Sequence, residues 1–106
     1  MTEALIVLIT TNTHESAHQI AEKLVEERLA ACVNIIPQIE SIYRWEGRIC
    51  RDQELLLIAK TEQPCFTQLE TTVRALHGYT TPEIIALPID SGSAPYLKWL
   101  TESLKS

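Results

Sequence analysis

Three short segments of this sequence are apolar at every position, and they constrain the fold more than any other feature. They are residues 5–9 (LIVLI), 55–58 (LLLI) and 84–87 (IIAL). A strand in a sheet with one wet face alternates apolar and polar side chains, because successive side chains point to opposite faces. Strands that are apolar throughout therefore predict a sheet whose two faces are both buried.

The first half of the chain predicts one helix and three strands. The apolar run over 4–9 indicates a first strand. A helix over 14–29 follows, with Asn12 and Glu15 as its expected capping box. Residues 32–45 predict a long second strand that bends at Pro37. Glu46 and Gly47 then form a hairpin turn into a third strand over 49–60, so these two strands should pair as a long antiparallel arm.

The second half predicts two more helices and one more strand. Pro64 suits the first turn of a helix that Gly78 ends, and a fourth strand covers 83–89. A last helix starts at Pro95, and its inner side carries Leu97, Leu100 and Leu104. This order predicts an α+β fold: a ferredoxin-like βαββαβ sandwich with an extra C-terminal helix, in a single domain over residues 1–106.

The predicted helices cannot bury both faces of this sheet. Two of them cover one face, and the short C-terminal helix is too small to cover the other. At about 25 cal/mol per Å², an apolar face of several hundred Å² represents on the order of 10 kcal/mol, which is too much to leave in water. We therefore expect a homo-oligomer, with Trp45 and Trp99 as subunit contacts.

Charge and cysteine usage exclude several classes of protein. The 9 basic and 14 acidic residues give a net charge of −5, the wrong sign for a nucleic-acid-binding face. Cys32, Cys50 and Cys65 are widely spaced without a CxxC pair, which indicates neither a disulfide framework nor a cysteine zinc site. The N-terminal apolar run is too short to span a bilayer and lacks a positively charged flank. We expect a cytoplasmic protein with reduced thiols and no membrane or nucleic-acid partner.

The turn before the fourth strand is the strongest candidate site. His77, Tyr79 and Glu83 place an imidazole, a phenol and a carboxylate close together beside a buried strand. Lys60 ends the third strand and is either a solvated strand end or an ammonium group that binds an anion. A packed turn whose side chains bond to the backbone would use the same residue types. We expect Lys60, His77, Tyr79 and Glu83 to form a ligand site in a cleft between subunits.

A second motif points to a different chemistry. His14, Glu15 and His18 form a literal HExxH, the signature in which two imidazoles bind Zn²⁺ and a glutamate activates water. The motif lies in the first turn of its predicted helix, where Glu15 should point towards solvent. We interpret it as a solvated helix start with no catalytic residue, and a zinc-dependent hydrolase is the alternative function.

Seven short motifs along nearly the whole chain are similar in order and spacing to the CutA divalent-cation-tolerance family. They are residues 27–35 (ERLAACVNI), 43–47 (YRWEG), 60–61 (KT), 77–79 (HGY), 81–84 (TPEI), 87–89 (LPI) and 96–100 (YLKWL). The resemblance implies a ferredoxin-like subunit in a tight trimer with the architecture of PII signalling proteins. It also implies a cytosolic role in tolerance of copper and other divalent cations, and no enzymatic reaction.

The resemblance also bears on metal binding. Family members associated with copper have a thiol late in the first strand and paired histidines just before the Tyr-x-x-Pro-Glu turn, at positions that are Ile9, Leu76 and His77 here. A soft Cu(I) site of that design has lost its sulfur and one imidazole. The expectation is therefore no required cofactor and weak binding of copper or another divalent cation, with His77 and Glu83 as ligands. A small anion is the other candidate ligand.

Overall fold

The fold is an α+β sandwich with the predicted order of elements. The computed structural model describes residues 2–105, so Met1 and Ser106 of the predicted domain lie outside the described residues. The elements are β1 (Ala4–Thr11), α1 (His14–Glu26), β2 (Cys32–Trp45), β3 (Arg48–Glu62), α2 (Phe66–Leu76), β4 (Ile84–Pro88) and α3 (Ala94–Ser103). All neighbouring strands are antiparallel, in the order β2-β3-β1-β4. This arrangement confirms the ferredoxin-like fold.

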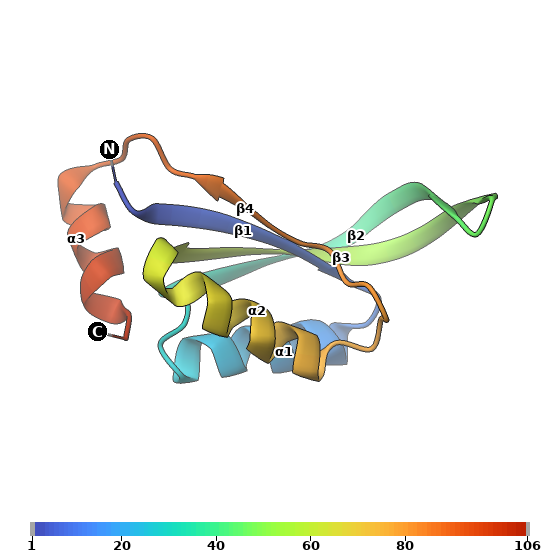
Figure 1. The fold of residues 1–106 in the computed structure, drawn as a ribbon, viewed down its shortest axis with the longest axis horizontal. Helices are drawn as coiled ribbons and strands as arrows, with labels where there is room; N and C mark the ends of the chain where they lie inside the picture. Colours follow the sequence, from blue (N-terminus) through green and yellow to red (C-terminus); the bar gives the residue numbers. More distant parts are fainter. Residues whose placement is uncertain (1, 106) are drawn as a thin grey trace.

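Helices α1 and α2 lie side by side on one face of the sheet (Figure 1). Their apolar stripes meet the odd-numbered side chains of β1 and β3, and this layer forms the main core. Its fully buried members include Val7, Ile9, Ile20, Leu24, Leu57, Leu69 and Val73. The core therefore occupies only one side of the sheet.

The start of α1 differs by one residue from the predicted cap. Thr13 is the N-cap, and its hydroxyl accepts a hydrogen bond of 3.0 Å from the backbone N–H of Ser16. The predicted capping box of Asn12 and Glu15 is therefore wrong, although the helix begins at residue 14 as expected. A threonine hydroxyl serves this position as well as an asparagine does.

The end of α1 comes three residues earlier than predicted. Arg28 adopts a left-handed backbone conformation with φ of 57°. The N–H groups of Leu29 and Ala30 then both donate to the carbonyl of Leu24, at 2.9 and 3.1 Å. This closed turn satisfies the last helical carbonyls and returns Leu29 to the core, where it is fully buried.

Strands β2 and β3 form the predicted long arm. Their pairing shifts register between Ile36 and Ile39, and Gln38 in this bulge has a φ of 61°. The bend predicted at Pro37 is thus confirmed as a β-bulge. Glu46 and Gly47 have φ values of 50° and 78°, which suits a tight hairpin turn. The arm projects well beyond the helices (Figure 1), and the molecule measures 44 × 25 × 22 Å.

Helix α2 also differs from its prediction at both ends. Pro64 lies in a 3₁₀ turn, Gln63–Cys65, that precedes the α-helix. The helix ends at Leu76 because His77 has extended backbone angles, φ −79° and ψ 142°. Gly78 is not among the glycines with positive φ, so it does not cap the helix through a left-handed conformation.

Helix α3 closes the end of the sheet near the N-terminus (Figure 1). Ser93 caps it, accepting a hydrogen bond of 3.3 Å from the N–H of Tyr96. Leu100 and Leu104 are buried with Ala4 and Cys65 in a second small core, and Leu97 packs against it. The predicted leucine stripe is confirmed. This helix covers the end of the sheet and leaves its second face open.

The second face of the sheet is apolar and has no cover within residues 2–105. Ile6 and Leu8 of β1 lie there, and their register partners Leu87 and Ile85 on β4 are 49% and 51% exposed. Ile36 on β2 is also exposed. We call these residues, together with Leu56 and Ile58 of β3, the open sheet face. The chain's own helices therefore bury one face only, as the sequence indicates.

A buried hydroxyl group on β3 donates a hydrogen bond to the turn after α1, and we expect its removal to lower the stability of the protein. Thr61 is fully buried and donates a hydrogen bond of 2.6 Å to the carbonyl of Leu29. Thr61→Val keeps the shape but leaves that carbonyl without this donor, and we expect it to lower the free energy of unfolding by about 1–2 kcal/mol. Guanidinium unfolding at one protein concentration measures it.

The matched control is Thr71→Val. Thr71 is exposed on α2 and donates to the carbonyl of Thr67 within the same helix. Its replacement should change the free energy of unfolding by less than about 0.5 kcal/mol. Equal losses in the two variants would show that the Thr61 contact is not specially stabilising.

Candidate functional site

The turn over residues 77–83 and the β2–β3 arm border a cavity of about 690 Å³. Its lining combines three aromatic rings, two carboxylates and several hydroxyls. The lining residues are Thr10, Ser41, Ile42, Tyr43, Trp45, Glu54, Gly78, Tyr79, Thr80, Thr81 and Glu83. Two of the four predicted ligand-binding residues, Tyr79 and Glu83, therefore line one cavity.

Tyr79 and Glu54 join the turn to the sheet at the cavity wall. The hydroxyl of Tyr79 donates a hydrogen bond of 2.7 Å to Oε2 of Glu54 on β3. The Glu54 side chain is buried, with 7% of the residue exposed. Burial, and then the hydrogen bond to Glu54, raise the pKa of Tyr79 above its ordinary value. The phenol therefore stays protonated and acts as a donor.

His77 holds the turn in place. Its Nε2 donates a hydrogen bond of 2.7 Å to the carbonyl of Thr10, and its Nδ1 accepts one of 3.1 Å from the backbone N–H of Tyr79. A carbonyl acceptor on one side and an N–H donor on the other select one neutral tautomer. The ring also contacts the Tyr79 ring, with centroids 4.6 Å apart, and His77 is buried. Both nitrogens are thus engaged, as in the packed-turn alternative.

Lys60 lies away from this cavity within the chain. It pairs with Ile6 across β1, whereas the carbonyl that His77 binds belongs to Thr10. At about 3.3 Å per residue, these two positions on β1 are roughly 13 Å apart. The Lys60 ammonium donates a hydrogen bond to Oδ1 of Asn34 on β2. One copy of the chain therefore does not bring Lys60 to the turn.

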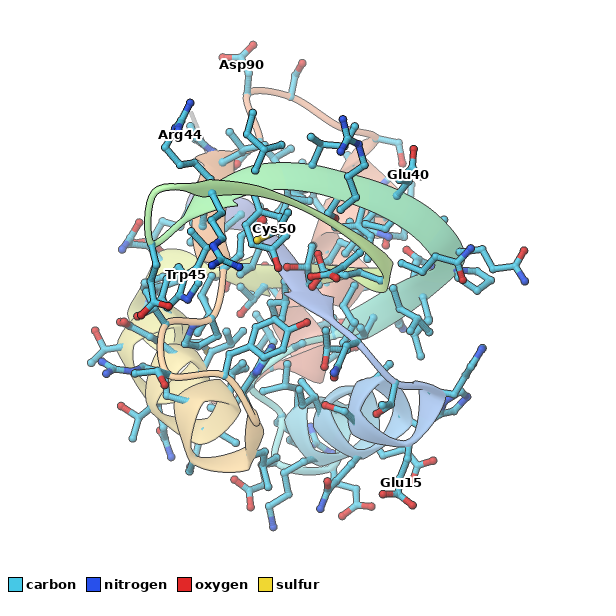
Figure 2. The ribbon with its side chains drawn as sticks, turned by 90° about the vertical axis from the view of Figure 1, so that its right-hand side faces the viewer. Glu15, Glu40, Arg44, Trp45, Cys50 and Asp90 are labelled. Carbon is cyan, nitrogen blue, oxygen red and sulfur yellow. The ribbon has the colours of Figure 1, made fainter. Side chains whose placement is uncertain are left out.

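The arm also lines this cavity, through residues that were not predicted to belong to the site. Tyr43 lines the cavity and donates a hydrogen bond from its hydroxyl to the carboxylate of Asp52. That bond, and then burial, raise the pKa of Tyr43 to about 12. Trp45 lies near the hairpin end, where it and Arg44 project to different sides of the arm (Figure 2). The available signal was an alternating Tyr-x-Trp pair together with a carboxylate, Glu54, directly before an apolar run.

The predicted metal ligands, His77 and Glu83, do not form a complete metal site within one chain. Within residues 2–105, no group of three or more His, Cys, Asp or Glu side chains is placed to hold a metal ion. Glu83 is exposed and lines the cavity, whereas His77 does not line it and forms hydrogen bonds through both ring nitrogens. A metal at His77 and Glu83 would need further ligands and would displace a hydrogen bond of the imidazole.

The residues of the HExxH motif lie at the start of α1 and do not converge on a cleft. His14 and His18 are exposed, and their ring centroids are 6.4 Å apart. Nδ1 of His18 donates to the carbonyl of His14 at 2.8 Å, a contact within the helix. Glu15 projects from the side of α1 that faces away from the sheet (Figure 2). None of the three residues lines the cavity beside the turn, so the structure does not support the zinc-hydrolase alternative.

Cys32, Cys50 and Cys65 are all free thiols. Among residues 2–105, no helix has both the length and the apolar character needed to cross a lipid bilayer.

Comparison with known proteins places the chain in a family. The family model of the CutA1 divalent ion tolerance protein matches residues 5–103. The divalent-cation tolerance protein CutA of Thermus thermophilus is 57% identical over 98 residues, which cover 92% of this chain and 95% of that protein. The chloroplastic protein CutA of Arabidopsis thaliana is 47% identical over 97% of this chain, but the match covers only 57% of the plant protein.

A solved structure agrees with the sequence matches. The divalent cation tolerance protein Cut A1 from Thermus thermophilus superposes with a TM-score of 0.95 at 55% identity, covering 96% of this chain and 99% of the other. The chain belongs to the CutA family of divalent ion tolerance proteins. The resemblance drawn from the seven motifs is confirmed.

The exposed position of His14 predicts that His14→Ala leaves the protein unchanged. Its ring lies on the helix surface, so we expect a change in the free energy of unfolding of no more than about 0.5 kcal/mol and an unaltered oligomeric state. Thermal unfolding and native mass spectrometry measure both. Loss of one tightly bound zinc per chain in this variant would contradict our interpretation and restore a metal centre at the motif.

Proposed function

We propose that this protein is a noncatalytic, homotrimeric divalent-cation-tolerance protein that binds a cation or another small ligand in clefts between its subunits. The observation that carries the proposal is the open sheet face, which the chain cannot cover by itself. The family match supplies the link to divalent cations. The family and the matched relatives are named for tolerance or as CutA proteins, and none of these names states a reaction.

Two surfaces support assembly with further copies of the chain. The first is the open sheet face, where Ile85 and Leu87 are about half exposed. The second is β2, a long edge strand whose outer backbone groups have no partner strand within the described residues. Apolar burial and strand pairing are both satisfied if neighbouring copies pack on these surfaces. If one surface of each copy contacts a different surface of the next copy, the smallest ring that closes has three copies. A trimer also agrees with the expected PII-like architecture.

The cavity beside the turn is the proposed ligand site. Tyr79 and Glu83 already line it, and the arm that forms its other wall is the element expected to meet a neighbour. Within its own chain Lys60 lies at the far part of β3, so a contact between Lys60 and this cleft would require another subunit. A copper ion at His77 and Glu83 would bind weakly, since the imidazole must first release Thr10 or Tyr79.

Assembly is tested by introducing charge on the open sheet face. Ile85→Glu places a carboxylate among apolar neighbours, so we expect it to abolish the trimer at micromolar concentration and to lower the unfolding temperature. Native mass spectrometry and a dilution series report subunit number. In the wild type, dissociation and unfolding should occur together.

Val25→Glu is the control for this experiment. Val25 is 45% exposed on α1, away from the sheet, so its replacement should leave the trimer intact. A folded wild-type monomer that persists at nanomolar concentration would contradict the proposed role of the open sheet face.

Copper binding is tested by calorimetry on the His77→Ala, Glu83→Gln double variant. We expect Cu²⁺ to bind the wild type weakly and the double variant at least tenfold more weakly, since one imidazole and one carboxylate are lost together. The His14→Ala, His18→Ala variant is the control for the surface histidine pair. Equal Cu²⁺ affinity in the wild type and the double variant, with both still trimeric, would exclude the cavity as the metal site.

A further inference from the structure

We infer that the cavity beside the turn binds a small organic cation, an ammonium group carried on an apolar body. This inference deepens the proposed function, because it names the ligand class of the same cavity. It rests on the charge, the aromatic lining and the size of the cavity, each of which is independent of metal coordination.

The charge of the lining selects a cation. Glu54 and Glu83 contribute two carboxylates, and none of the described residues that line the cavity is a lysine, arginine or histidine. Asp52 adds a third carboxylate at the Tyr43 hydroxyl. An anionic ligand would meet like charges with no donor of positive charge, so a small anion is disfavoured here.

Glu54 gives the most specific signal. The residue is only 7% exposed, and its described partner is the neutral hydroxyl of Tyr79. Among residues 2–105, the salt bridge in the structure joins Lys23 and Glu27 on α1. Glu54 therefore forms no salt bridge with a basic side chain of the described residues. A buried carboxylate is costly unless a positive charge pairs with it. A ligand ammonium bound in the cavity would supply that charge through a charge-assisted hydrogen bond.

The aromatic lining matches the same ligand. Tyr43, Trp45 and Tyr79 are three of the six aromatic residues among Phe, Trp and Tyr in the whole chain. Aromatic faces attract cations through their negative π surface, and tryptophan does so most strongly. Ile42 adds an aliphatic surface. An ammonium ion on an apolar body can use the carboxylate and the rings at the same time.

The size of the cavity argues for an organic molecule. Its volume of about 690 Å³ lies in the range of about 300–1,000 Å³ that is usual for small-molecule sites. A bare metal ion needs several ligand atoms within about 2.0–2.6 Å. Within the described residues no group of three such side chains converges. The cavity is therefore better matched to an amine than to a metal ion.

The experiment uses the fluorescence of Trp45 in the full-length Trp99→Phe protein. Trp45 and Trp99 are the two tryptophans of the chain, and Trp99 on α3 does not line the cavity. The probes are benzylamine, benzyl alcohol and benzoate, which share one ring and differ in charge. We expect saturable quenching by benzylamine at neutral pH, and at least tenfold weaker binding of the alcohol and of benzoate.

A matched pair of variants locates the binding site. Glu54→Gln removes the charge but keeps an oxygen that can accept the Tyr79 hydrogen bond, so we expect benzylamine affinity to fall at least tenfold. Glu62→Gln changes a carboxylate of the same strand that accepts from Thr101 and does not line the cavity. It should bind benzylamine as the wild type does. Circular dichroism checks that both variants are folded.

Three results would overturn the inference. The first is equal affinity for benzylamine and benzyl alcohol, and the second is unchanged affinity in Glu54→Gln. The third is that benzylamine binds only after Arg44, Arg48 or Arg51 is replaced by alanine. These arginines are exposed on the arm, and that result would mean that a neighbouring copy's guanidinium already occupies the cavity.

The outcome is separable from that of the proposed function. Native mass spectrometry on the same samples reports the trimer, and Cu²⁺ calorimetry reports metal binding. A trimer that binds Cu²⁺ but not benzylamine would overturn this inference alone. A monomer that binds benzylamine through Glu54 would overturn the proposed assembly and leave the ligand class standing.

Discussion

The rest of this structure depends on burying an apolar sheet that the chain can cover on one face only. Helices α1 and α2 supply the apolar stripes that bury Val7, Ile9 and Leu57. Helix α3 is used at the end of the sheet, against Ala4 and Cys65. Within residues 2–105, no helix is left to cover the open sheet face. The same shortage leaves the β2–β3 arm without helical cover along much of its length.

The cavity follows from how the chain returns to this sheet after α2. His77 leaves the helix in an extended conformation and donates a hydrogen bond to the carbonyl of Thr10, which fixes the turn against the end of β1. Tyr79 is then directed towards Glu54 on β3. Because His77 carries out this positioning with both ring nitrogens, the polar groups left for a ligand are the carboxylates and the phenol. The imidazole shapes the site without lining it.

Local patterns predicted the elements well, because periodicity and turn chemistry are read from neighbouring residues. The hairpin at Gly47 and the bend at Pro37 are of this kind. The end of α1 was less predictable, because Arg28 adopts a left-handed conformation that arginine does not favour. The hydrogen bonds to the Leu24 carbonyl and the burial of Leu29 stabilise this turn. Glu54 was missed for a similar reason. Its role depends on Tyr79, which lies far away in the sequence and meets it only in the fold.

The turn separates two environments, and this bears on which ligand the chain can hold. Ile9 and Leu76, the positions where the family resemblance implies soft copper ligands, pack in or against the main core with His77 behind the turn. That side is apolar and filled. The cavity lies on the other side, where Tyr79 and Glu83 face a space bounded by the arm. A soft metal site would have to form inside the packed core, where this chain offers aliphatic side chains and an imidazole with no free nitrogen. The open, acidic and aromatic side is therefore where ligand recognition in this chain is best sought.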